Sequence, residues 1–578
     1  MKIETIRHSL AHIMAAAVQE LYPETCFGIG PAIENGFYYD FDLKRSISPE
    51  DLPKIEEKMR ELIKKNISFK KETVMRRSLI TLFDKQPYKL ELIKEFPGRK
   101  LTIYKSGEFV DLCAGPHVKS TLQLHSGQAK EIIDAFKLTK IAGAYWRGSE
   151  KNPMLTRIYG VAFKTKKELE SYLQKEAEAE KRDHRVLGQK LELFSFDEEI
   201  GAGLPLWHPK GAQLRRIIEN FITEELLKAG YQLVNSPHIG KEDLFQTSGH
   251  LDFYKENMYS PIEIEKEKYY LKPMNCPFHI KIYNSKIRSY RDLPIRLAEL
   301  GTVYRYEKSG VLHGLVRVRG FTQDDAHIFC TPEDLSKELI SLLKFAKIIL
   351  KTFGFKEFEI TLTTRPEKYV GTLKIWEKAS NALKYALNQV GLTYQIESKE
   401  APFYGPSVNL KIKDSLGRPW QCTTIQVDFN LPEKFNLNYI DQKGKKKRPI
   451  MVHRAILGSI ERFIGVLLEN YAGALPLWLS PEQIWVIPVG ARHEKYAREI
   501  NEKLNVAGFR CQLKEENETV SKKIRDGEIQ KIPYLLVVGD KEMKTNSVRV
   551  RERGKGDIGK MKLKKFLEKV KIEIDNKK

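Results

Sequence analysis

The spacing of hydrophobic and polar positions predicts several kinds of element along the chain. Ile6, Leu10, Ile13 and Met14 recur at helical spacing, so we expect an N-terminal amphipathic helix. Residues 37–41 are strand-like and follow a turn signal. Residues 164–190 carry dense charge and few apolar side chains, which indicates a solvated connecting helix. The first third of the chain therefore mixes helix and strand before a polar connector.

The segment 296–330 has the most informative pattern. Two hydrophobic runs, Leu297–Tyr304 and Leu315–Phe321, flank a polar turn at 307–310 and predict a long antiparallel hairpin. Arginines lie on it, and a planar guanidinium binds phosphate or carboxylate oxygens in a bidentate manner. An exposed, charged hairpin without a ligand is the alternative that the pattern alone leaves open.

The pattern predicts further elements before and after this hairpin. An amphipathic helix is expected over 212–229, a strand over 231–234, and a late helix beginning at 450–454. The last hundred residues alternate between strand and helix patterns, as in a mixed α/β layer. Strands are predicted at 484–489, 509–513 and 533–538, and a helix at 493–506.

The length of 578 residues predicts several domains rather than one. We expect an α+β multidomain protein with segments at 1–163, 164–190, 191–478 and 479–578. Lys and Arg number 98 against 76 Asp and Glu, and the formal charge of +22 favours a polyanionic partner, although a generically basic protein has the same composition.

Cysteine usage and hydropathy restrict the class of protein. Six scattered cysteines form no disulfide framework, and no apolar run approaches the roughly 18 residues of a membrane span. The N-terminus has no cleavage-site pattern. We expect a cytoplasmic protein in a reducing compartment, with no membrane partner.

Two groups of soft or borderline ligands are candidate metal sites. His8 and His12 share a helix face, and Cys113 and His117 have the spacing Cys-x3-His. The four residues could bind zinc, be satisfied separately, or form a metal-free pocket that positions water for ester hydrolysis.

The second group is Cys276, His327 and His453. Cys276 lies between prolines, and one Cys with two His would leave a fourth zinc position open for substrate. Scattered core residues are the alternative.

Four strings in order make a specific resemblance. They are LKPMNCP, RYEKSGVLHGLVRVRGFTQDDAHIF, WQCTTIQVDF and HRAILGSIERFIG. Together they resemble threonyl-tRNA synthetase, a family of class II aminoacyl-tRNA synthetases, over essentially the whole chain. The implied activity is a ligase that activates L-threonine with ATP and Mg²⁺ and transfers it to the 3′ end of tRNA(Thr).

The resemblance assigns the expected hairpin to ATP. Arg305 matches the arginine that binds the α-phosphate, Glu307 the group that meets the adenine amino group, and Phe321 the ring stacked on adenine. Arg317 matches an arginine near the γ-phosphate, and Arg462 matches the second phosphate arginine. Positioning and charge neutralisation by such groups account for most of the rate in this kind of reaction.

The resemblance also implies one catalytic zinc per subunit, held by Cys276, His327 and His453. The amino and hydroxyl groups of threonine would occupy the remaining positions, and Asp325, Tyr404, Gln421 and Gln426 would line the threonine pocket. A site built around a hydroxyl rejects valine, but the methyl that serine lacks is worth only about 1–3 kcal/mol. A second, hydrolytic site for seryl-tRNA(Thr) is therefore chemically expected.

The N-terminal group resembles that editing site. It comprises His8, His12, Cys113 and His117, with Asp111, Lys89 and Tyr39 as helpers. Members of this family are thought to edit without metal, so we assign metal to the catalytic domain alone. By the same resemblance, 1–163 is the editing domain, 191–478 the catalytic domain and 479–578 the anticodon-binding domain.

Other implied roles concern tRNA and assembly. His250 matches a histidine implicated in transfer to the tRNA ribose, and Asn517, Glu542 and Arg551 match positions that contact anticodon bases. The family is a homodimer through a long helix and a strand ending at Pro237.

Departures from the family pattern concern the pocket and the N-terminus. Phe278 stands where the family has glycine, Ser407 where it usually has lysine, and Thr423 where it has a smaller residue, so we expect the fine shape of the pocket to differ. A small ubiquitin-like N-terminal module that is common in the family is not seen here. A paralogue without aminoacylation and a seryl or prolyl synthetase are the rival interpretations, and the Cys-His-His set with Asp325 argues against both.

Overall fold

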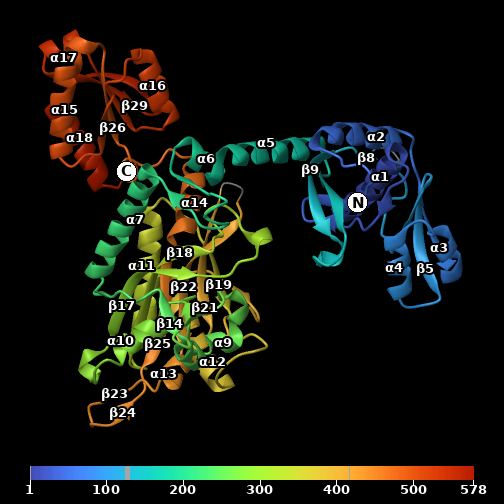
Figure 1. Ribbon diagram of the computed structural model, residues 1–578, viewed down its shortest axis with the longest axis horizontal. Helices are drawn as coiled ribbons and strands as arrows, with labels where there is room; N and C mark the ends of the chain where they lie inside the picture. Colours follow the sequence, from blue (N-terminus) through green and yellow to red (C-terminus); the bar gives the residue numbers. More distant parts are fainter. Residues whose placement is uncertain (1, 124–130, 415–416, 578) are drawn as a thin grey trace. The chain divides into compact units, whose positions relative to one another are not determined.

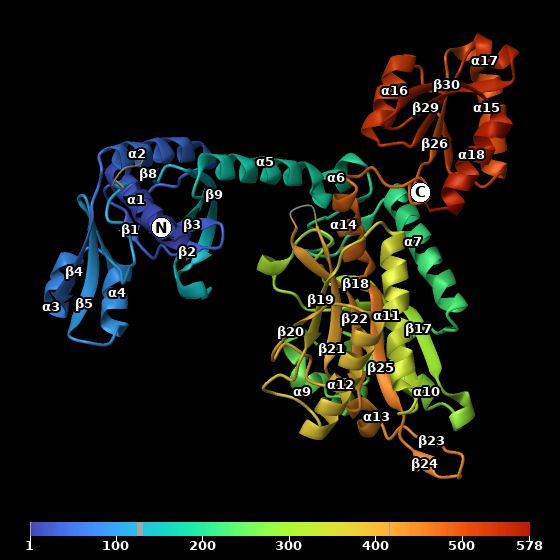
Figure 2. The same cartoon turned by 180° about the vertical axis from the view of Figure 1, so that it is seen from behind.

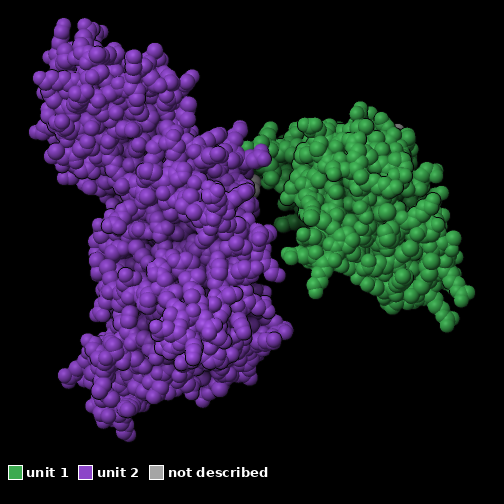
Figure 3. Space-filling view, viewed as in Figure 1, with its two compact units in different colours: residues 1–177 green, residues 178–578 purple. Residues whose placement is uncertain are grey.

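The computed structural model describes residues 2–123, 131–414 and 417–577 and forms two compact units, Met1–Ala177 and Glu178–Lys578 (Figure 3). Helix α5 (Lys166–Arg182) crosses the boundary between them, and α6 (His184–Lys190) follows. The sequence predicted one connecting helix, but Asp183 adopts a non-helical backbone conformation, and its side chain accepts a hydrogen bond from the Arg185 amide. Asp183 therefore starts a second helix as its N-cap.

The N-terminal unit is built on helix α1 (Ile3–Leu21), which packs against a sheet and against α2 (Leu52–Lys64) (Figure 1). Strand β3 is central to the sheet because it pairs with three other strands. The sheet comprises β1 (Cys26–Phe27), β2 (Ala32–Ile33), β3 (Gly36–Asp42), β9 (Phe136–Tyr145) and β10 (Met154–Ala162). Apolar residues of α1 and β3, among them Ile13, Met14 and Phe37, are fully buried between the helix and the sheet.

The same unit has a second, smaller layer, whose last strand ends directly before Cys113. It has a three-stranded antiparallel sheet and two helices with a core of their own. Its elements are β4 (Phe69–Met75), α3 (Arg76–Leu82), α4 (Pro87–Glu95), β5 (Lys100–Ser106) and β6 (Phe109–Leu112). The short strands β7 (Leu122–Gln123) and β8 (Glu131–Ile132) pair separately.

An eight-stranded, mostly antiparallel sheet dominates the second unit (Figure 2). In spatial order its strands are β13 (Gln232–Leu233), β17 (Ile295–Tyr304), β18 (Gly320–Cys330), β25 (Ile450–Ser459), β22 (Pro419–Asp428), β21 (Ser407–Lys413), β19 (Glu359–Thr363) and β20 (Gln395–Glu397). The main core lies between this sheet and the helices α7 (Pro209–Lys228), α11 (Leu335–Thr352), α12 (Leu373–Val390) and α14 (Ile460–Asn470).

Smaller elements of the second unit flank this sheet. A three-stranded sheet is formed by β14 (Ile239–Lys241), β15 (Ile262–Ile264) and β16 (Glu267–Leu271). The neighbouring helices are α8 (Glu242–Ser248), α9 (His250–Phe253), α10 (Cys276–Tyr283) and α13 (Asn430–Lys434). Two short hairpins pair β11 (Phe194–Ser195) with β12 (Leu206–Trp207) and β23 (Tyr439–Ile440) with β24 (Lys446–Lys447).

The structure corrects two predictions about these strands. The expected second strand at Leu315–Phe321 is mostly loop, because β18 begins at Gly320. The chain therefore runs through a long connection from Arg305 to Arg319, and Asp325 and His327 lie within a strand rather than after one. The expected helix at 450–454 is also wrong: β25 covers these residues and α14 starts only at Ile460. Both faces of β25 are buried, so apolar residues occur at consecutive positions and the sequence lacks the alternation that would identify a strand.

The last part of the second unit is a five-stranded mixed sheet with helices, as the alternating pattern predicted. Its strands, in spatial order, are β27 (Cys511–Leu513), β26 (Ile484–Pro488), β28 (Tyr534–Val538), β29 (Ser547–Glu552) and β30 (Gly556–Lys562). Its helices are α15 (Glu494–Val506), α16 (Val520–Ile529), α17 (Asp540–Lys544) and α18 (Leu563–Asp575). Within the described ranges, no helix combines the length and the apolar character needed to cross a bilayer.

Candidate active site

A cavity of about 540 Å³ opens on the large sheet of the second unit. It gathers side chains from strands that are far apart in sequence. Of the residues predicted to bind ATP, threonine or metal, those that line it are Cys276, Arg305, Glu307, Arg317, Phe321, Asp325, His327, Tyr404, Gln421, Gln426, His453 and Arg462.

The strand register explains why these residues meet. Asp325 and His327 are two positions apart on β18 and therefore point to the same face of the sheet, whereas Ala326 and Ile328 point into the core. In the strand register, His327 lies opposite His453 of β25, and His453 lies opposite Gln426 of β22. Three neighbouring strands thus place their polar side chains on one face.

The three predicted metal ligands are close together. One ligand atom each of Cys276, His327 and His453 lies within 4.8 Å of the others, and all three residues are buried. Cys276 is the first residue of α10, which brings it to the sheet from outside.

Both imidazoles of this trio use one ring nitrogen in a hydrogen bond. His453 Nε2 lies 2.9 Å from Asp428 Oδ2. His327 Nδ1 lies 2.8 Å from His279 Nδ1, and His279 Nε2 lies 3.0 Å from Glu299 Oε2. Such partners fix the orientation of a metal-binding imidazole and raise its basicity. The donor set therefore fits a zinc ion with an open position.

Burial keeps Cys276 and His327 neutral in the absence of a cation. Desolvation, followed by Asp325 and Asp428, raises the pKa of the Cys276 thiol well above its usual range. Desolvation, followed by His279 and His453, lowers the pKa of His327 well below its usual range. A divalent cation would stabilise the Cys276 thiolate, so metal binding would release a proton.

Arginines line another part of the cavity. Arg317 Nη2 forms an ion pair of 3.0 Å with Glu307, and the Arg305 guanidinium lies 5.1 Å from the centre of the Phe321 ring. Arg462 Nε donates to the carbonyl of Val316 at 2.9 Å. The positive charge of three guanidinium groups suits a polyphosphate.

Polar groups also surround the metal trio. Asn275 Nδ2 donates to Asp325 Oδ2 at 3.0 Å, and Gln426 Nε2 donates to the Gly405 carbonyl at 2.7 Å. The ring of Tyr404 lies 5.2 Å from that of His453, and Gln421 donates to Asn409 at 2.9 Å. These contacts fix the polar atoms of Asp325 and Gln426 beside the trio.

The three departures from the family pattern are not among the described residues that line the cavity. Phe278 packs with Phe245 and Tyr270 in a small apolar cluster. Ser407 bonds Thr363 at 2.7 Å, and Thr423 donates to the Ile456 carbonyl at 2.6 Å. Each of these three side chains has its packing or hydrogen-bond partners outside the cavity lining.

His250 is also absent from the described lining of the cavity. It is the first residue of α9, it is buried, and its Nδ1 lies 2.7 Å from Ser248 Oγ. Burial, with contributions from His453, Arg305 and Lys434, lowers the pKa of His250 to about 3. It is a neutral imidazole near the site rather than on its surface.

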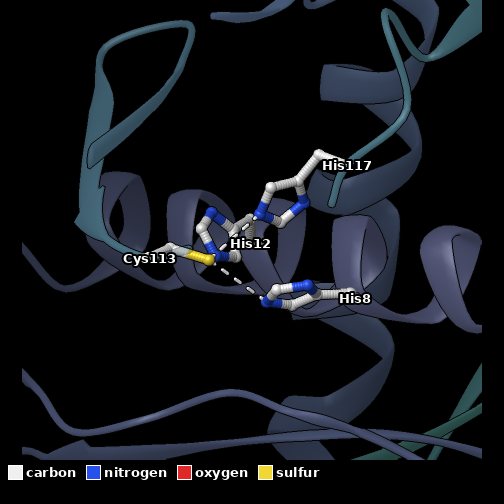
Figure 4. A group of neighbouring side chains, drawn as sticks. All are labelled: His8, His12, Cys113 and His117. Atoms are coloured by element: carbon white, nitrogen blue, oxygen red, sulfur yellow. Dashed lines mark hydrogen bonds between the residues drawn. The ribbon is translucent and has the colours of Figure 1, made fainter. Parts of the chain in front are cut away.

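The N-terminal group is assembled in the first unit (Figure 4). His8 and His12 come from α1, and Cys113 and His117 come from the segment after β6. Cys113 Sγ lies 3.4 Å from His8 Nε2 and 3.3 Å from His117 Nε2. All four ligand atoms lie within 4.8 Å of one another.

The predicted helpers form a buried network beside this group. Tyr39 donates to Asp111 at 2.6 Å, and Lys89 forms an ion pair with Asp111 and bonds the Tyr39 hydroxyl at 3.1 Å. His12 Nε2 lies 3.4 Å from Asp111. The structure thus brings all seven predicted residues together.

The imidazoles of this group are held neutral. Burial, with the neighbouring His12 and His8, lowers the pKa of His117 to about 2, and burial followed by His8 and Lys89 lowers the pKa of His12 well below its usual range. Burial also raises the pKa of the Cys113 thiol to about 11. The cluster therefore presents neutral donors and acceptors rather than charges.

The three residues predicted to read the anticodon have different surroundings. Asn517 is exposed in a bend after β27, and Arg551 on β29 forms a 3.4 Å ion pair with Glu528. Glu542 is buried and its carboxylate accepts from the Gly539 amide at 3.1 Å, capping α17. No hydrogen bond or ion pair joins any two of the three among the described side chains.

Sequence reasoning missed the groups that support the trio. Asp428, His279 and Glu299 were not predicted, although Asp428 lies within the string WQCTTIQVDF and His279 directly follows CPF. A polar residue inside an apolar run was the available signal. Glu299 lies in such a run on β17.

Known families match three parts of the chain. Residues 259–471 match the tRNA synthetase class II core domain (G, H, P, S and T), residues 483–573 the anticodon binding domain, and residues 101–159 the threonyl and alanyl tRNA synthetase second additional domain.

Individual proteins are similar over larger spans. Threonine–tRNA ligase of Sulfurihydrogenibium sp. is 55% identical over 582 residues, covering 100% of this chain and 89% of that protein. The enzyme of Aquifex aeolicus is 52% identical and covers 100% of this chain and 90% of its own. A crystal structure titled as the RNA binding domain of threonyl-tRNA synthetase from Cryptosporidium parvum is 40% identical, has a TM-score of 0.65, and covers 68% of this chain and 98% of its own.

Proposed function

The chain belongs to the threonine–tRNA ligase family of class II aminoacyl-tRNA synthetases, and from that premise we propose how its residues share the reaction. The protein is a ligase that activates threonine with ATP and transfers it to the 3′ end of tRNA(Thr). The proposed active site is the cavity of the second unit. The observation that supports it is that one cavity contains every residue assigned to ATP, threonine and zinc.

The arginines would act on ATP together with Mg²⁺. Arg305, Arg317 and Arg462 border the cavity and would hold the triphosphate, with Glu307 and Phe321 at the adenine. A carboxylate oxygen of threonine then forms a bond to the α-phosphorus while the bond to pyrophosphate breaks. Because little proton transfer is needed, these side chains contribute by positioning the reactants and neutralising charge.

Cys276, His327 and His453 would hold the zinc ion. When bound, zinc would act as a Lewis acid toward the amino and hydroxyl groups of threonine. Asp325 is held by Asn275 and would accept the hydrogen bond of the threonine hydroxyl. Valine lacks this hydroxyl, so its activation would leave buried polar groups unpaired. His250 is assigned to the later transfer step.

The N-terminal cluster would hydrolyse seryl-tRNA(Thr). His8, His12, Cys113 and His117 would bind and orient the ester and a water molecule without metal. Lys89, Asp111 and Tyr39 would hold His12 in place. Serine fits this second site because it is smaller than threonine.

The remaining assignments concern tRNA, assembly and location. Residues 1–163 are proposed as the editing domain, 191–478 as the catalytic domain and 479–578 as the anticodon-binding domain. Asn517 and Arg551 would contact anticodon bases, whereas Glu542 would act through α17, which its carboxylate caps. We also assign a homodimer, one zinc per subunit and a cytoplasmic location.

Pyrophosphate exchange across the twenty amino acids tests the proposal. We expect ATP–pyrophosphate exchange with threonine, weak exchange with serine and none with proline. Exchange with proline or serine in preference to threonine would refute the assignment. Addition of tRNA(Thr) should then yield threonyl-tRNA. If no threonyl-tRNA formed, the protein would be a paralogue without aminoacylation.

A further inference from the structure

His184 joins three segments of the second unit at one imidazole. It is the first residue of α6, which follows the connecting helix α5, and its side chain is fully buried. Its Nδ1 lies 2.8 Å from Glu469 Oε1 on α14, and its Nε2 lies 3.0 Å from the amide nitrogen of Leu315. Leu315 belongs to the long connection between β17 and β18.

The hydrogen bonds fix the tautomer of this histidine. A backbone amide only donates, so Nε2 must be the unprotonated acceptor, and Nδ1 must carry the proton that it donates to Glu469. Asp183, His184 and Glu469 have ligand atoms within 4.8 Å of one another. Since both ring nitrogens are already used, a metal ion would have to break one of these bonds. We therefore interpret this group as a clamp rather than as a metal site.

Two glycines allow the imidazole to approach both partners. Gly314 has φ +45°, and a Cβ at this position would lie 2.2 Å from His184 Nε2. A Cβ at Gly465, on α14, would lie 3.4 Å from the imidazole ring. The close approach of the loop backbone to the ring thus depends on the absence of a side chain at Gly314.

The segment held by His184 contains groups that face the cavity. His313 and Arg317 exchange backbone hydrogen bonds of 3.1 and 3.2 Å, which close a tight loop around Leu315. The next residue, Val316, accepts from Arg462 Nε at 2.9 Å, and Arg317 forms an ion pair with Glu307. The position of the Leu315 amide therefore determines where Arg317 lies and how Arg462 is braced.

We propose that His184 is a positioning residue for ATP: it clamps the 313–317 loop to α14 and thereby holds Arg317 and Arg462 in place for the triphosphate. The inference rests on the proposed function, because it needs the cavity to bind ATP. His184 touches no substrate. Its effect is transmitted through the backbone of the loop and should therefore appear in ATP binding and not in threonine binding.

Two substitutions separate the two hydrogen bonds of the imidazole. His184→Asn places an amide nitrogen where Nδ1 was and keeps the bond to Glu469, but it leaves the buried Leu315 amide without an acceptor. His184→Gln places an oxygen where Nε2 was and keeps the acceptor for Leu315. Comparing the two isolates the bond to the loop from the bond to α14.

The measurement is threonine-dependent pyrophosphate exchange at varied ATP, with the thermal midpoint recorded for each protein. We expect His184→Asn to raise KM for ATP about tenfold, which corresponds to about 1.4 kcal/mol, while KM for threonine stays near the wild-type value. We expect His184→Gln to restore most of the ATP affinity even if it lowers the thermal midpoint. His493→Asn, at another buried histidine, should leave KM for ATP unchanged.

Other outcomes would overturn the proposal. If the Gln variant lost ATP affinity and the Asn variant kept it, the bond to Glu469 would be the important one and His184 would only anchor α6. Gly314→Ala moves the loop without removing the imidazole and should also raise KM for ATP; an unchanged KM would refute the clamp. If the wild-type protein showed no threonine-dependent exchange, the proposed function would fail instead, and equilibrium dialysis of ATP against the same variants would still test His184.

Discussion

Two clusters of cysteine and histidine, one in each unit, have similar composition but different surroundings. The first unit has His8, His12, Cys113 and His117, and the second has Cys276, His327 and His453. In both, burial raises the pKa of the thiol and lowers the pKa of at least one imidazole. Ligand type and spacing therefore do not distinguish a metal site from a metal-free hydrolytic site.

The neighbouring charges differ between the clusters. Asp428 bonds His453, and Asp325 lies beside His327, so negative charge adjoins the second cluster. In the first cluster the carboxylate of Asp111 is already paired with the buried ammonium of Lys89. An ammonium group at this position opposes a divalent cation. The two clusters are therefore distinguished by the charged groups around the ligands rather than by the ligands themselves.

The largest expected effect is the loss of activation in Cys276→Ser. Removal of the thiol leaves two imidazoles, too few to retain zinc, so threonine-dependent pyrophosphate exchange should fall to background. Cys113→Ser should keep exchange and lose deacylation of seryl-tRNA(Thr), and Cys511→Ser serves as the control for loss of a thiol. Normal exchange in Cys276→Ser without zinc would refute the role of the trio.

A smaller effect is expected from Lys89→Met. The substitution removes the ammonium that fixes Asp111 and Tyr39, so the orientation of His12 is lost. We expect deacylation of seryl-tRNA(Thr) to fall about 10²- to 10⁴-fold, the usual contribution of a positioned acid–base group. Pyrophosphate exchange should be unchanged, as in the exposed control Lys151→Met. Unaltered deacylation would contradict the role of this network.

The groups behind the trio should have a weaker effect. His279→Leu removes the partner of His327 Nδ1, and we expect zinc affinity to fall about 10- to 100-fold. His279→Asn offers an amide oxygen in place of His279 Nδ1 and should retain more of the affinity. Competition with a zinc chelator measures the zinc affinity of both variants. Equal affinity in His279→Leu and wild type would show that His279 only fills space.

The smallest effect concerns pH and the first cluster. The folded pKa of His117, about 2, lies below the unfolded value near 6.5, so its contribution to stability is complete above pH 6.5 and is lost as pH falls below it. At pH 5 the loss is about 2 kcal/mol for one such imidazole. His117→Asn removes this contribution and should reduce the difference in stability between pH 8 and pH 5.

Hydrogen exchange of the amides of α1, corrected for intrinsic rates, measures this stability in the full chain at both pH values. An exposed histidine, His238, provides the control substitution His238→Asn, which should leave the pH dependence as it is. An identical pH dependence in wild type and His117→Asn would contradict the buried neutral imidazole.

The sequence predicted residue identities at the site better than the elements that carry them. Strings around Cys276, Arg305 and His453 were sufficient to assign the family, and they contain residues that line one cavity. The strand containing His453 was predicted as a helix, because a central strand buried on both faces has no alternation. The start of β18 was also misplaced, because the apolar run at Leu315 is buried loop that rests on His184.

Partners that depend on long-range packing were beyond the reach of the sequence. The contacts of His327 with His279, and of His184 with Leu315, join segments separated by 48 and 131 residues. Periodicity reports local structure only, so a polar residue inside an apolar segment indicates that it has a buried partner but does not identify the partner.

Zinc content per chain tests the central comparison most directly. Metal analysis of the purified full-length protein, of Cys276→Ser and of Cys113→Ser should give one zinc, none and one per chain, respectively. Two zinc ions in the wild-type protein, or a loss of zinc in Cys113→Ser with retention in Cys276→Ser, would contradict the assignment of metal to the second unit alone.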